Sequence, residues 1–188
     1  MAGERAALLV MDVQNGILER YEDGAEALLK RLQRAIAAAR EASIPVIYVR
    51  VAFRDGNPEI SARNRSFSAI GDSGGFGEDD DATQVHEAIA PEPGDSVVLK
   101  KRVSAFTGSD LDVLLRGLEV DTIVLTGVAT SGVVLSTLRQ AADRDFGLVV
   151  LADGCLDGDD EVHRVLTEKV FPRQAEVTTT EEWVAGLG

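Results

Sequence analysis

Cysteine and histidine are scarce in this chain of 188 residues, and their scarcity excludes several kinds of site. The single cysteine, Cys155, cannot form an internal disulfide or a multi-cysteine zinc site. The two histidines, His86 and His163, leave little for a metal cluster, and both lie among charged neighbours in helix-like segments that are typical of a protein surface. We therefore expect a protein without a metal ion or a cofactor.

Basic residues and long apolar runs are also few. Nineteen Lys and Arg residues stand against thirty-two Asp and Glu residues, which leaves a net charge of −13. A surface this negative repels nucleic-acid phosphates and anionic membranes. The apolar run at residues 6–11 ends at Asp12 and is too short for a signal peptide or a membrane span. We expect a cytoplasmic protein that acts on a small molecule and binds neither nucleic acid nor membranes.

Short apolar runs alternate with longer amphipathic segments along the chain. The apolar runs predict strands at residues 6–11, 45–51, 96–99, 121–126, 146–153 and 175–180. The amphipathic segments predict helices at residues 24–42, 81–90, 109–118, 131–144, 159–171 and 181–187. Continuous apolar runs indicate strands buried on both faces, as in a parallel sheet. The order predicts one α/β domain over residues 1–188, doubly wound, with a mostly parallel central sheet of five to six strands flanked by helices.

One long segment, residues 53–80, has no predicted helix or strand. Loops of this length in a compact domain are usually lids or interface segments. It contains the sequence GDSGGF, which matches serine-nucleophile patterns around Ser73. A nucleophile elbow requires a strand before the serine and a helix after it. Ser73 lies instead in polar, glycine-rich chain, so we interpret the motif as a flexible or interface turn.

Polar residues follow several of the predicted strands, at the edge where parallel sheets bind ligands. Asp12 follows the first strand, with Gln14 close behind, and Lys100 follows the third strand. A turn that begins at Gly127 follows the fourth strand. A carboxylate at the end of a buried strand is costly unless it is paired or hydrogen-bonded. Asp12 and Lys100 therefore predict an ion pair at this edge, either structural or functional.

Three motifs at these separations resemble the isochorismatase-like hydrolases, also called the cysteine hydrolase superfamily. The motifs are DVQN at 12–15, KKRVSAF at 100–106 and LTGVAT at 125–130, and the similarity runs from about Ala6 to Trp183. The resemblance implies a central parallel sheet and assembly into homodimers or homotetramers. It also implies hydrolysis of C–N bonds in small amides, which typical members carry out with an Asp–Lys–Cys triad.

The resemblance assigns a role to each matching position. Asp12 matches the aspartate that takes the thiol proton, and Lys100 matches the lysine. Val128, Ala129 and Val133 belong to the turn that carries a cis peptide and an oxyanion hole of backbone N–H groups. At the position of the cysteine nucleophile this chain has Val133, which excludes a covalent acyl-enzyme there.

True isochorismatases also lack this cysteine, and they use the aspartate as a general acid on a vinyl ether. The resemblance therefore implies a cofactor-free hydrolase that acts through Asp12 and Lys100 on a small anionic molecule. Two motifs differ from isochorismatases: KKRVSAF replaces KWRYSAF, and GVATS follows the amidase turn. The Asp-x-His metal ligands of nicotinamidase-type members have no match near residues 51–58. Candidate substrate-binding residues are Gln14, Phe53 and Arg54, with Phe67 and Phe76 as pocket walls or interface residues.

Two alternatives remain open on the sequence. Val133 is compatible with a catalytically silent member that binds a metabolite or a partner protein, although the presence of both Asp12 and Lys100 favours an enzyme. Cys155 follows the fifth predicted strand at the same sheet edge, so it is either a small buried thiol or a displaced nucleophile.

Overall fold

Six parallel strands form the centre of the computed structural model, which describes residues 5–73 and 75–188, without the side chains of residues 22–23 and 70–73. The strand order is β3-β2-β1-β4-β5-β6, as in a doubly wound sheet. The strands are β1 (Ala6–Met11), β2 (Val46–Val51), β3 (Ser96–Lys100), β4 (Thr122–Val128), β5 (Gly147–Leu156) and β6 (Glu176–Thr178). The predicted fold class is confirmed, and the sheet is parallel throughout.

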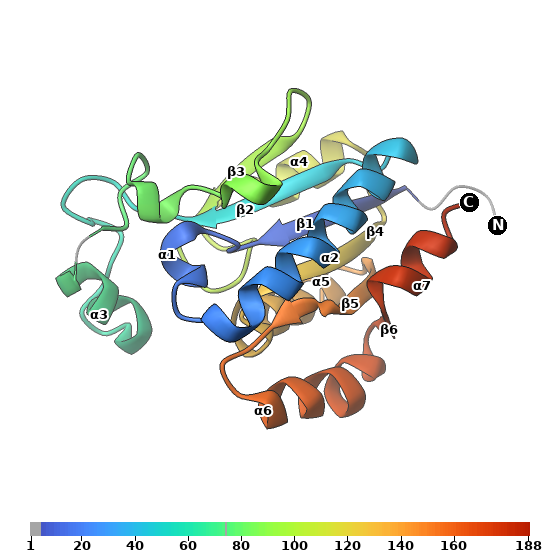
Figure 1. Ribbon diagram of the computed structural model, residues 1–188. Coiled ribbons are helices and arrows are strands. Elements are labelled where there is room, and N and C mark those ends of the chain that lie inside the picture. The colour runs from blue at the N-terminus through green and yellow to red at the C-terminus, as the bar shows by residue number, and fades with distance from the viewer. Residues whose placement is uncertain (1–4, 74) are drawn as a thin grey trace.

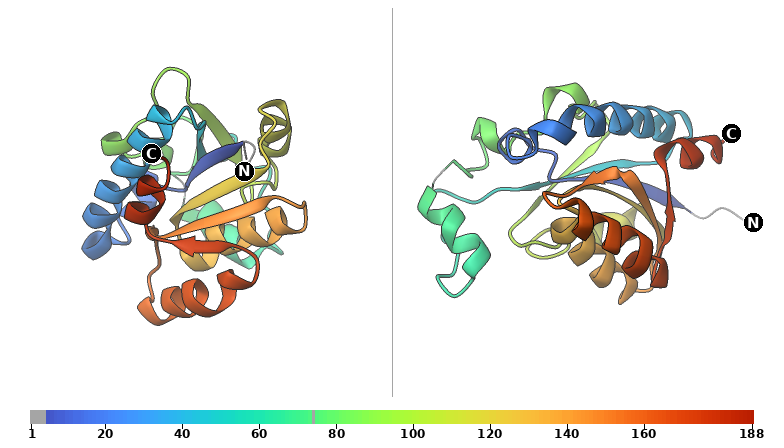
Figure 2. Two further views of the ribbon diagram at one scale, coloured as in Figure 1. Left: turned by 90° about the vertical axis from the view of Figure 1, so that its right-hand side faces the viewer. Right: turned by 60° about the horizontal axis from the view of Figure 1, so that its bottom comes forward.

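Helices cover both faces of this sheet (Figures 1 and 2). One face carries α2 (Glu22–Glu41) and α7 (Thr180–Ala185), and the other carries α4 (Leu111–Gly117), α5 (Leu135–Ala142) and α6 (Asp160–Val165). In the part of the chain that the structure describes, no helix combines the length and the apolar character needed to cross a membrane.

Strand β1 supplies the core on both faces because its side chains alternate in direction. Leu8 and Val10 are buried with Leu32 of α2 in one apolar cluster. Leu9 is buried with Leu138 of α5 in the other cluster. A strand with no solvent-exposed face places whatever follows it directly against the core, and the residue that follows β1 is Asp12.

The ends of β1 and β4 lie unusually close together at Gly127. Gly127 pairs with Met11 and has a φ of +136°, a conformation that side chains other than glycine rarely adopt. A Cβ atom on Gly127 would lie 2.1 Å from the carbonyl oxygen of Met11. Glycine therefore allows the turn after β4 to begin beside Asp12.

The segment 53–80, which the sequence left without regular structure, contains a helix, α3 (Arg65–Ser73), that extends beyond the carboxyl edge of the sheet (Figure 1). Lys101 anchors the ends of this segment, since its ammonium donates to the carbonyl of Ala52 at 2.7 Å and to Glu78 at 2.8 Å. The GDSGGF motif spans the end of α3, but the side chain of Ser73 and all of Gly74 lie outside the described residues.

The helix predicted at residues 81–90 is wrong. Two short 3-10 turns, Asp81–Thr83 and Glu87–Ile89, stand there instead. The chain between them is extended because it pairs with the residues that follow β1: Val85 forms an antiparallel bridge with Gln14. Tertiary pairing has overridden the local helical pattern.

We expect the Gly127→Ala variant to be destabilised by about 3 kcal/mol or more, because the new methyl group meets a backbone oxygen and the φ angle is strained. Chemical denaturation measures the change. Gly132→Ala is the control, since its Cβ atom would lie in ordinary contact, 3.7 Å from that of Ala129. Equal stability of the two variants would contradict the close approach of β1 and β4.

Candidate active site

Asp12 and Lys100 form a buried ion pair, as the sequence predicted. The Nζ atom of Lys100 lies 2.9 Å from Oδ2 of Asp12, and the side chains are only 2% and 9% exposed. Asp12 follows β1 and Lys100 ends β3, so the lysine reaches past the end of the intervening strand β2. Lys100 also donates to the carbonyl of Arg102 at 2.9 Å, which holds its ammonium at the edge of the sheet.

The two carboxylate oxygens of Asp12 have different surroundings. Oδ2 is bound by Lys100, whereas Oδ1 is buried and has no hydrogen-bond partner among the described residues. Burial raises the pKa of the Asp12 carboxyl above its ordinary value, and the ammonium of Lys100 offsets only part of that rise. Oδ1 is therefore the carboxylate oxygen that no described protein group occupies.

A cavity of about 180 Å³ opens at this ion pair. Its wall includes Asp12, Lys100, Phe67, Val128, Ala129 and Val133. The structure thus brings together the predicted catalytic pair, the predicted turn and Val133, the position where the resemblance places a nucleophile. The Val133 side chain lines the cavity without filling it.

The turn after β4 has the form that the family resemblance implies. The Val128–Ala129 peptide bond is cis, and residues 130–134 form a π-helical turn before α5 begins. The carbonyl of Ala129 accepts hydrogen bonds from Gly132 N at 3.1 Å and Val134 N at 3.3 Å. Val128 and Ala129, the residues on the two sides of the cis bond, both line the cavity.

Two side chains from the loop after β5 and from α6 support this turn from outside. The Ser131 N–H donates to Asp157 at 2.6 Å, and Thr130 Oγ1 lies 2.8 Å from Nδ1 of His163. His163 is half-buried at this contact, not a free surface residue as its sequence neighbours suggested. No local sequence signal pairs His163 with Thr130, because the contact exists only once α6 has packed beside the turn.

The three predicted substrate-binding residues lie outside the cavity. Gln14 is fully buried, and its amide binds the backbone of Val51 and the carbonyl of Thr83, so it joins β2 to the turn at Asp81–Thr83. Phe53 is also fully buried and packs edge-on behind Phe67, with ring centroids 5.8 Å apart. Arg54 is exposed and pairs with Glu59 at 2.5 Å. Phe67 and Phe76, by contrast, both line the cavity.

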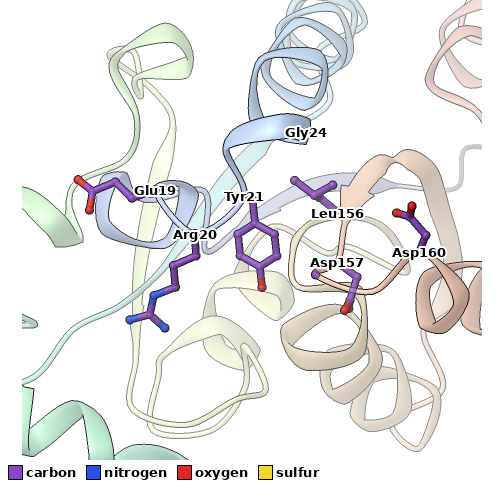
Figure 3. Close-up of a pocket in the computed structure, with 8 residues that line it drawn as sticks. Glu19, Arg20, Tyr21, Gly24, Leu156, Asp157 and Asp160 are labelled. Carbon is purple, nitrogen blue, oxygen red and sulfur yellow. The ribbon is translucent and has the colours of Figure 1, made fainter.

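Three residues that were not predicted from the sequence also line the cavity. They are Ile17 of α1 (Asn15–Leu18), Arg20 and Tyr21. Arg20 is exposed and makes no ion pair with any side chain that the structure describes. Arg20 and Tyr21 also border a second, larger hollow, drawn in Figure 3. The polar segment after α1 gives no sign in the sequence that it reaches the site.

Cys155 is a small buried thiol. It pairs with Gly127 between β5 and β4, its Sγ atom lies 3.9 Å from the carbonyl oxygen of Leu125, and it belongs to an apolar core cluster. Burial raises the pKa of this thiol to about 12. Cys155 is not among the residues of the cavity wall, so a displaced nucleophile finds no support.

Metal ligands do not gather in the described residues. Across those ranges, no group of three or more His, Cys, Asp or Glu side chains is arranged to hold a metal ion.

Comparison with known proteins gives consistent results. The isochorismatase domain model matches residues 6–182. The chain is 31% identical over 182 residues to the uncharacterised isochorismatase family protein YwoC of Bacillus subtilis, covering 96% of this chain and 93% of that protein. It is 35% identical over 181 residues to the ureidoacrylate amidohydrolase RutB of Methylobacterium radiotolerans, covering 84% of this chain and 69% of RutB. The structure resembles a cysteine hydrolase from Pseudomonas syringae with a TM-score of 0.88 and 26% identity, covering 97% and 92% of the two chains.

We expect Cys155 in the folded protein to resist iodoacetamide, because the reactive thiolate is scarce at neutral pH and the sulfur is shielded. Mass spectrometry after a timed exposure measures the extent of alkylation. Protein unfolded in guanidinium is the control and becomes fully labelled. Rapid labelling of the folded protein would support the alternative hypothesis that Cys155 is a nucleophile.

Proposed function

Because the chain belongs to the isochorismatase family and is a hydrolase of that family, we propose that it cleaves a small anionic molecule by acid catalysis, without a covalent intermediate. The observation that carries this proposal is the unpartnered, buried Oδ1 of Asp12 at an open cavity. Val133 supplies no nucleophilic atom, and the cavity beside it still has room for a reacting group.

The reaction that fits this arrangement is hydrolysis of an enol ether of pyruvate. Oδ1 of protonated Asp12 gives its proton to the terminal vinyl carbon, and positive charge develops on the carbon that carries the ether oxygen. Water adds to that carbon and forms a hemiketal, which splits into pyruvate and an alcohol. The proton that the water releases returns to Asp12, and no cofactor takes part.

Lys100 has a defined role in this sequence. Once Asp12 has given up its proton, a buried carboxylate remains, and the ammonium at 2.9 Å stabilises that charge. The same contact occupies Oδ2, so that Oδ1 is the carboxylate oxygen left without a hydrogen-bond partner among the described residues. Proton donation therefore comes from this one atom.

Arg20 supports an anionic substrate. Among the described side chains of the cavity wall three are charged, and two of these, Asp12 and Lys100, are paired with each other. Arg20 is the third, and a guanidinium suits the planar carboxylate of a pyruvate enol ether. In this proposal Arg20 binds the substrate, a role that was predicted from the sequence for Arg54.

A catalytically silent binding protein is the second candidate, motivated by Val133. A cavity closed by the valine would favour it, but the space beside Val133 is open. The two candidates differ in outcome, because a silent protein shows a thermal shift with ligand and forms no product.

We expect Asp12→Asn to lower the release of pyruvate from its enol methyl ether by roughly 10²–10⁴-fold, because the amide cannot donate the proton. Pyruvate is measured with lactate dehydrogenase, after subtraction of the uncatalysed acid hydrolysis. The exposed Asp143→Asn is the matched control and should keep full activity.

The pH profile is a second readout of the same acid role. The proton-bearing form of Asp12 is the active one, so kcat/KM should be highest at low pH and fall as the pH rises through the raised pKa of Asp12. Asp12→Asn should lose this limb. Unchanged turnover in Asp12→Asn, or a rate that increases with pH, would refute acid catalysis by Asp12.

We expect Val133→Cys to gain hydrolysis of ureidoacrylate, the compound for which the RutB relative is named, because a thiol at this position restores the Asp–Lys–Cys triad. Ammonia release measures the activity. Val134→Cys is the control, since that position is fully buried and is not among the residues that line the cavity. If the introduced thiol at position 133 reacts with iodoacetamide but no ammonia forms, the turn does not stabilise an oxyanion.

A further inference from the structure

The catalytic cavity is smaller than most ligand pockets. Ligand pockets usually measure about 300–1,000 Å³. The cavity at Asp12 measures about 180 Å³, which corresponds to the liquid volume of roughly six water molecules. It accommodates a reacting group, and the remainder of a larger substrate must lie elsewhere.

A second hollow, of about 660 Å³, adjoins this cavity. We call it the outer hollow; it is bordered by the segment after α1 and by the segment from the end of β5 to α6 (Figure 3). Arg20 and Tyr21 line both spaces. The two spaces therefore share these two residues as a common boundary.

The walls of the outer hollow offer mainly hydrogen-bond acceptors. Asp157 and Asp160 stand on the side of α6, and the phenol of Tyr21 points between them and Arg20 (Figure 3). Burial, and secondly the negative charge of Asp157, raise the pKa of Tyr21, so its hydroxyl remains protonated. A ligand portion that carries hydroxyl or ammonium donors suits this wall.

Asp157 connects the outer hollow to the turn after β4. Asp157 accepts the hydrogen bond from Ser131 N at 2.6 Å, so one of its carboxylate oxygens holds the turn while the residue borders the outer hollow. The ring of Tyr21 lies beside Gly158, where an added Cβ atom would be 3.6 Å from Cε1 of the tyrosine. The glycine thus leaves space that a larger side chain would fill.

We propose that the outer hollow is a second substrate subsite, which binds the alcohol portion of an elongated ether through hydroxyl or ammonium donors. This inference rests on the proposed function, in which the enol end of the ether reacts at Asp12. Arg20 and Tyr21 stand at the junction of the two parts, the guanidinium toward the carboxylate and the phenol toward the donor-bearing tail.

The test separates binding from turnover by using lactate ethers, which lack the vinyl group and cannot react. We expect O-(hydroxyhexyl) lactate and O-(aminohexyl) lactate to bind about tenfold more tightly than O-methyl lactate by calorimetry. O-hexyl lactate, with the same length and no donor, should gain less. Equal affinity of the hexyl and hydroxyhexyl ethers would overturn the assignment of a donor-bearing tail.

Gly158→Leu narrows the outer hollow, because Gly158 borders that space and is not among the residues that line the catalytic cavity. It should abolish the gain from the tail, measured as the ratio of the affinities of the hydroxyhexyl and methyl ethers in the same variant. Gly117→Leu, at the end of α4 where an added Cβ meets nothing within 4 Å, is the matched control. If the tail keeps its tenfold gain in Gly158→Leu, the outer hollow is not the subsite.

Asp160→Asn provides a second variant that does not depend on a bulky side chain. It should weaken binding of the aminohexyl ether more than that of the hydroxyhexyl ether, and equal effects on both would overturn the role of this wall. Tail-dependent binding without release of pyruvate from any enol ether would leave the subsite supported and refute the proposed reaction. Release of pyruvate with no effect of the tail would support the proposed reaction and refute the subsite.

Discussion

The buried contact between Asp12 and Lys100 is the constraint on which the site depends. An uncompensated charge at these positions would cost several kcal/mol, and removal of one partner from a buried pair typically costs about 3–5 kcal/mol. The pair is possible only because β1 and β3 end at the same edge with β2 between them, within reach of a lysine side chain. The doubly wound strand order therefore does more than build a core: it brings the acid and its counter-ion together.

The backbone at this edge of the sheet has an unusual conformation. Gly127 lets β4 end against Met11, and the chain then turns sharply through the cis Val128–Ala129 bond into a π-helical turn. Val133 faces the cavity from this turn. Asp12 and the turn therefore border the same cavity, although they come from different strands.

Most of the fold, and the centre of the site, followed from the sequence. The buried strands were predictable because continuous apolar runs have few alternatives, and Asp12 and Lys100 stood out as charges directly after such runs. Other features depended on contacts between distant segments. Strand β5 continues to Leu156 because Cys155 and Leu156 pair with β4 beyond a register shift, which no local pattern records. Gln14 followed the right strand but turned inward to bind backbone groups.

Three residues that border the two spaces were not predicted from the sequence. Arg20, Tyr21 and Asp157 lie in polar connecting segments, where composition does not distinguish a solvated loop from the wall of a cavity. Their position matters because Phe67, Phe76 and Val133 restrict the space around Asp12. Burial of Asp12 among these side chains raises the pKa of its carboxyl. In the proposed function, the strand ends therefore carry the proton chemistry, and the connecting segments carry the recognition of a larger substrate.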